Sequence, residues 1–172
     1  VRSLEEAKLI IFNDAPNVHP ALQKRIVQSV RDGADLLIFG GLFTLAKGEF
    51  KDSSLERILP VKLGEIFKLS GSSKTPLSLS AKAPFNWDAA GKKMYYYYGF
   101  EPVEGSTVLM TASEDGWFGT KDIPVLVSKK FGKGTVYVLN GTAAGPNKED
   151  SFYNCGFTES LLKFIEQERA AK

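Results

Sequence analysis

The sequence predicts an α/β fold in which parallel strands are extended by an antiparallel β region. Two short apolar runs, residues 9–12 and 36–39, are typical of strands buried on both faces of a parallel sheet. A helical pattern lies between them, and many short β-like runs separated by turn residues follow. Strand, helix and strand at this spacing predict a right-handed crossover, which makes the two strands parallel neighbours.

The helix between these strands has a clear beginning and end. Pro20 suits the first turn of a helix, and Gly33 suits the left-handed position beyond its last turn. The apolar residues fall on one helical face; they are Leu22, Ile26, Val27 and Val30. The sequence therefore predicts an amphipathic helix that packs on the sheet and leads directly into the second strand.

The rest of the chain predicts a mostly antiparallel meander framed by two helices. A short helix over residues 55–59, capped by Ser53 or Ser54, precedes the β-like runs. These runs are residues 61–69, 77–81, 94–100, 107–111, 124–129 and 135–139. The glycines of Phe131-Gly-Lys-Gly134 permit a tight hairpin between the last two runs. A helix over residues 157–169, with Thr158 as its cap, then docks on the sheet.

Composition excludes several classes of function. A chain of 172 residues with 43% hydrophobic and 24% charged residues is typical of one globular domain, residues 1–172. The net charge of +2 is spread along the chain, so we expect no nucleic-acid binding, and no apolar run is long enough for membrane insertion. One Cys and one His cannot build a typical structural metal site, and no cofactor motif is present. Localisation stays open.

An ordered set of segments carries a resemblance to a known superfamily. The segments are Leu9-Ile-Ile-Phe-Asn-Asp14, Val30-Arg-Asp-Gly33, Leu36-Leu-Ile-Phe-Gly-Gly41, Ser54-Leu-Glu-Arg-Ile-Leu-Pro-Val61 and the hairpin of residues 125–138. In this pattern the chain resembles the class I glutamine amidotransferase-like superfamily, in particular its branch with trehalose-utilisation-like members. The resemblance implies a flavodoxin-like, three-layer core.

The chain departs from that superfamily at two places. Active members carry a nucleophilic Cys on a sharp turn after a central strand, but the comparable turn here holds Phe39, Gly40, Gly41 and Leu42, none of which can attack a carbonyl. Members also begin with a further strand and helix, whereas this chain starts a few residues before Leu9. We therefore expect a non-catalytic binding or interaction domain, amino-terminally incomplete, from a larger bacterial protein.

The expected binding surface lies at the carboxyl ends of the parallel strands, where α/β proteins place their sites. Its candidate residues are Asn13, Asp14, His19, Gly40, Gly41, Thr44 and Asn140. Asn13 and Asp14 also suit local turn bonds, and the glycines suit a tight turn as well as an anion held by backbone N–H groups. The ligand is an unidentified small molecule or protein partner.

Two other functions remain open. Cys155 precedes a predicted helix and could form a displaced triad with His19 and Asp14, as in a hydrolase or amidotransferase, although a lone Cys is usually a packed apolar residue. An aromatic-rich region could instead bind a sugar or pack in the core. It comprises Tyr95 to Tyr98, Phe85, Trp87, Phe100, Trp117 and Phe118.

Overall fold

The computed structural model describes residues 3–13, 18–40, 45, 50–69, 77–79, 83–88, 90–94, 96–116, 119–140 and 156–171. Its two α-helices are α1 (Pro20–Asp32) and α2 (Phe157–Ala170), and its short 3₁₀ helices are η1 (Leu4–Glu6) and η2 (Glu56–Ile58). The strands are β1 (Leu9–Asn13), β2 (Asp35–Phe39), β3 (Val61–Leu69), β4 (Leu77–Leu79), β5 (Lys93–Met94), β6 (Tyr96–Pro102), β7 (Ser106–Gly116), β8 (Gly119–Phe131) and β9 (Gly134–Leu139).

Within the described residues, the strands form one large sheet and one small one. The large sheet has the order β1-β2-β9-β8-β7-β4-β5, and the small sheet pairs β3 with β6. β1, β2 and β9 are parallel, whereas β8, β7, β4 and β5 are added in antiparallel pairs. The predicted α/β class, with a parallel core and an added antiparallel region, is confirmed.

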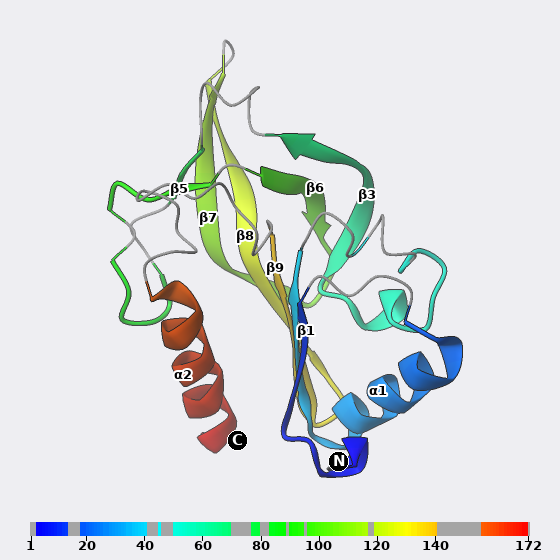
Figure 1. Ribbon diagram of the computed structural model, residues 1–172. Helices are drawn as coiled ribbons and strands as arrows, with labels where there is room; N and C mark the ends of the chain where they lie inside the picture. Colours follow the sequence, from blue (N-terminus) through cyan, green and yellow to red (C-terminus); the bar gives the residue numbers. More distant parts are fainter. Residues whose placement is uncertain are drawn as a thin grey trace.

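The central strands are buried on both faces because a helix covers each face. All residues of β2 and β9 are buried. Leu36 and Ile38 of β2 pack into the cluster that contains Ile26 of α1, whereas Leu37 of the same strand packs into the cluster that contains Leu161 of α2. The two helices therefore lie on opposite sides of the large sheet (Figure 1).

The hairpin between β8 and β9 is confirmed, and its glycines have a steric reason. Phe131 pairs with Gly134, and Gly132 takes a left-handed φ of +61°. A Cβ on Gly134 would lie 2.0 Å from the carbonyl oxygen of Ala34, at the start of β2. The hairpin backbone therefore packs directly on the end of α1 and the start of β2, where Lys133 N–H donates to the carbonyl of Arg31 at 3.0 Å.

Several predicted boundaries hold and some are wrong. β3 has the predicted bounds, and Ser53 Oγ accepts from Glu56 N–H at the start of η2, as the capping pattern indicates. Thr158 is not the cap of α2, because the chain enters this helix through Gly156 in the left-handed conformation, without a side-chain cap. The meander prediction holds for β7, β8 and β9, whereas β3 leaves the main sheet to pair with β6.

Candidate functional site at the carboxyl ends of the parallel strands

The strand register brings three candidate residues to one edge of the sheet. Asn13 pairs with Phe39, and Phe39 pairs with Leu139, so Gly40 and Asn140 follow neighbouring strand ends. The expected surface therefore exists for Asn13, Gly40 and Asn140. The other candidates that follow these strands lie outside the described residues; they are Asp14, Gly41 and Thr44.

Asn140 has a structural use for its side chain. The residue is fully buried, and its backbone N–H donates to the carbonyl of Val125 at 2.6 Å. Its side-chain Nδ2 donates to the carbonyl of Pro124 at 2.9 Å. Asn140 thus continues the hydrogen bonding between β9 and β8 past the end of the strand, which anchors this edge of the site.

Gly40 likewise directs its backbone into the sheet. Its N–H donates to the carbonyl of Leu139 at 2.8 Å, so it cannot also be directed at an anion beyond the strand end. The anion-binding interpretation of the glycine pair therefore has no contribution from Gly40.

His19 lies on the wall of a pocket. It is the N-cap of α1, and its Nδ1 accepts from Ala21 N–H at 3.2 Å. With Nδ1 used as this acceptor, Nε2 is the ring nitrogen that can face a ligand. The ring borders a pocket of about 530 Å³ whose lining residues are Val18, His19, Pro20, Gln23, Lys51, Asp52, Ser53 and Ser54. We call this space the His19 pocket.

Gln23 joins the two walls of the His19 pocket. Its Nε2 donates to the carbonyl of Val18 at 2.7 Å, and its Oε1 accepts from Ser54 N–H at 3.3 Å. The available sequence signal was its spacing: Gln23 lies three residues before Ile26 and seven before Val30, so it shares the apolar face of the helix, where a polar side chain needs hydrogen-bond partners. Sequence reasoning missed Gln23 as a site residue.

The opposite wall, residues 50–56, is held by its own hydrogen bonds. Ser53 Oγ donates to the carbonyl of Phe50 at 2.6 Å, and the carboxylate of Glu56 accepts from Asp52 N–H. Asp52 takes a left-handed φ of +60°, which places an acidic side chain on the pocket wall. The Ser-Ser-Leu-Glu sequence signals this arrangement, because a Ser three residues before a Glu is a capping pattern.

The described residues of the His19 pocket offer binding groups but no activated nucleophile. Ser53 donates its hydroxyl proton to a backbone carbonyl instead of to a base, and the Nδ1 of His19 is occupied by a backbone N–H. No cluster of three metal-ligating side chains occurs in the part of the chain that the structure describes. Cys155, the thiol of the displaced-triad hypothesis, lies outside it.

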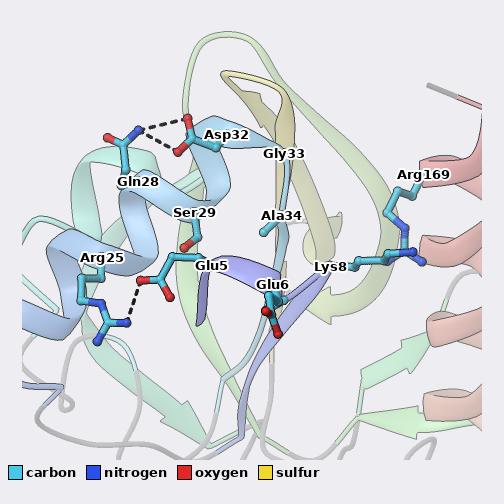
Figure 2. A pocket seen from close by; sticks show the side chains of 11 residues that line it. Glu5, Glu6, Lys8, Arg25, Gln28, Ser29, Asp32, Gly33, Ala34 and Arg169 are labelled. Carbon is cyan, nitrogen blue, oxygen red and sulfur yellow. Dashed lines mark hydrogen bonds and ion pairs between the residues drawn. The ribbon is translucent and has the colours of Figure 1, made fainter. Parts of the chain in front are cut away.

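A second pocket lies at the opposite, amino end of the parallel strands (Figure 2). It has a volume of about 480 Å³ between η1, the end of α1 and Arg169 of α2. Glu5 and Arg25 form an exposed ion pair of 2.7 Å across it. The hydrogen bond from the Arg25 guanidinium lowers the pKa of Glu5 to about 2. Because both side chains are exposed and already paired, this pocket has less binding potential than the His19 pocket.

Two aromatic residues of the sugar-binding hypothesis are packed against α2. Phe85 and Trp87 make edge-to-face contacts with Phe157, at ring-centroid distances of 5.6 and 4.9 Å. Phe85 also contacts Phe164 at 5.5 Å. These rings contribute to the core under α2, which favours packing over sugar stacking for this pair. The side chains of the tyrosines 95–98, of Phe100, and of Trp117 and Phe118 lie outside the described residues.

Comparison with known proteins identifies the fold. No known protein family matches the sequence, and no curated protein matches it. Cytoplasmic proteins STM3548 and STM1381 from Salmonella typhimurium have the same fold, each with a TM-score of 0.69. They are 17% and 16% identical; the alignments cover 94% and 92% of this chain, and 73% and 71% of theirs.

The same fold also forms a part of glycosidases. The β-galactosidase from Rahnella sp. R3 matches 92% of this chain with a TM-score of 0.59 and 16% identity. This chain covers only 23% of that enzyme. At such identities the likeness shows a shared fold alone.

Neither α-helix in the described part of this chain has the length and hydrophobicity needed to cross a membrane.

Proposed function

We propose that this chain is a non-catalytic binding domain, similar to the class I glutamine amidotransferases in fold, that holds a small polar ligand in the His19 pocket. The observation that carries the proposal is the arrangement of His19 and Ser53. Both polar groups lie on the pocket wall, yet each uses a backbone partner instead of the other. The pocket is therefore suited to hydrogen bonding and lacks the proton transfer that catalysis by this pair would need.

The lining of the His19 pocket favours an uncharged or zwitterionic ligand. One cation, Lys51, and one anion, Asp52, stand on the same wall, and His19, whose Nδ1 already accepts the hydrogen bond from Ala21 N–H, can offer its Nε2 side to a ligand. Hydroxyl and amide groups complete the lining. Such a balanced set of donors and acceptors recognises sugars and amino acids better than it recognises strong anions.

We further propose that the domain works within a larger bacterial protein. Its fold makes up 23% of two β-galactosidases and 25% of an exo-β-1,4-mannosidase, so this architecture occurs as one part of sugar-processing enzymes. Galactose and mannose are therefore suitable probes, and glutamine is a third because of the superfamily resemblance.

The proposal is tested by titrating the ¹⁵N-labelled domain with galactose, mannose and glutamine separately and recording amide chemical shifts. Saturable shifts centred on Ala21, Gln23 and Ser54 are expected for at least one probe. Asp52→Gly removes the carboxylate, and glycine accepts the left-handed φ without strain, so binding should weaken while the fold persists. Shifts that are absent for all three probes, or that Asp52→Gly leaves unchanged, would contradict the proposed site.

A separate measurement tests the non-catalytic part. We expect Cys155 to react with iodoacetamide no faster than an ordinary thiol of pKa about 8.5. Rapid alkylation near neutral pH, together with loss of that reactivity in His19→Asn, would instead support the displaced-nucleophile enzyme. Asn is chosen because it preserves the N-cap of α1.

A further inference from the structure

A basic groove lies beside the His19 pocket, between α1, η2 and the end of β8. Its volume is about 280 Å³. Three cationic side chains line it, from Lys24 and Arg31 of α1 and Arg57 of η2. Its apolar lining comes from Val27, Ile58 and Phe131. The groove thus combines positive charge with an apolar floor.

The fold fixes the positions of these charges. Lys24 and Arg31 are seven residues apart, which places them two turns apart on one face of α1. The Arg31 guanidinium lies 5.5 Å from the centroid of the Phe131 ring, a cation–π contact that holds it over the groove. Arg57 comes from η2, whose Ile58 is buried in the core and anchors the turn.

No acidic side chain is among the seven residues that line this groove in the described structure. The nearest acids in the sequence have other partners: Asp32 accepts from Gln28 at 2.9 and 3.0 Å, and the Glu56 carboxylate accepts from Asp52 N–H. Folding therefore gathers three like charges without an acid in the lining to offset them. Such an arrangement gains from a bound anion, which removes the mutual repulsion.

We propose that the basic groove binds a phosphate monoester carried on a small apolar body. Lys and Arg side chains are the usual protein ligands of phosphate, and three of them match a dianionic head group. The volume corresponds to about nine water-sized groups, which suits a phosphate that carries one small ring better than it suits a larger ligand. The apolar body lies on Val27, Ile58 and Phe131. This site is independent of the His19 pocket, with which it shares only Ser54.

Phenyl phosphate is the probe, with inorganic phosphate and phenol as its two halves. Titrations of the ¹⁵N-labelled domain should give saturable shifts at Lys24, Arg57 and Arg31, which line the groove and not the His19 pocket, strongest for phenyl phosphate. Arg57→Gln should weaken its binding about fivefold. Arg169→Gln removes the same charge from α2, outside the groove, and should change the affinity less than about twofold.

Each outcome decides the proposal. Equal losses in Arg57→Gln and Arg169→Gln would mean general charge attraction and would overturn it, as would shifts centred on the His19 pocket. Binding of inorganic phosphate as tight as that of phenyl phosphate would overturn the role of the apolar floor. Lys24→Gln provides a second exposed substitution on the groove if Arg57→Gln alters the melting curve, and the same weakening is expected from it. Sugar or glutamine binding at the His19 pocket has no bearing on these results.

Discussion

Replacement of Gly134 by Ala is expected to be among the most damaging single-methyl additions to this protein. The new Cβ would lie 2.0 Å from the Ala34 carbonyl oxygen and 2.5 Å from that of Val30, and both obstacles are backbone atoms. Real Cβ contacts stay beyond 3.0 Å, so the hairpin would have to move by about 1 Å. That movement separates Thr135 N–H from the buried Asp35 carboxylate, with which it makes a 2.8 Å hydrogen bond.

Overpacking of this kind costs about 3 kcal/mol of unfolding free energy, and for a domain of this size that lowers Tm by about 6–12 °C. Urea unfolding followed by circular dichroism, with a thermal melt, measures both. Gly91→Ala is the matched control: apart from its chain neighbours, no atom of the described residues lies within 4 Å of its added Cβ. Its left-handed φ of +69° is therefore the main cost, about 1 kcal/mol. If Gly134→Ala proved no less stable than Gly91→Ala, the steric argument would be refuted.

Three further predictions concern single side chains. His19→Ala should lower the unfolding free energy by about 1 kcal/mol in urea titrations because α1 loses its N-cap, whereas His19→Asn should retain most of it. Arg25→Gln should return the pKa of Glu5 from about 2 toward 4.5 in a carboxyl ¹³C NMR titration. The stabilisation that this ion pair gives the wild-type protein is present above pH 4.5 and is lost as the pH falls through 2. An unchanged pKa of Glu5 would disprove the pairing. Burial, with the nearby Asp35 charge, raises the pKa of Tyr137 to about 12, so its phenol should ionise above pH 10 in an ultraviolet titration. The unfolding free energy should therefore fall as the pH rises from 10 to 12. Tyr137→Phe should remove the tyrosine ionisation seen at this high pH.

The parallel core could be predicted because its signals are local. Residues 9–12 and 36–39 are continuous apolar runs, and the helix between them has Pro20 at its start and Gly33 at its end. Each signal depends on neighbours within a few residues, which sequence displays directly. The partner of β3 could not be predicted, because pairing with β6 is a contact between distant segments that no local pattern specifies.

The candidate site was only partly predictable for the same reason. His19 was identified from its place after a parallel strand, and the structure puts it on a pocket wall. Gln23 and Asp52 were missed, since their roles depend on α1 lying beside residues 50–56. The basic groove was also missed, because acidic and basic residues are interspersed along the whole sequence. Lys24 and Arg57 are 33 residues apart in the chain, and only the tertiary fold brings them together.

The backbone hydrogen bonds of the β7–β8 ribbon and those of the central strands β2 and β9 should differ in how easily they open. The pairing of β7 with β8 continues to Gly116 and Gly119, at one end of the ribbon. In Figure 1 the ribbon of β7 and β8 extends toward the top of the view, away from α1 and α2. Because β2 and β9 are buried on both faces, we expect their amides to exchange with solvent only through global unfolding. We therefore expect the paired amides at that end of the ribbon to exchange with solvent by local opening, earlier than those of β2 and β9.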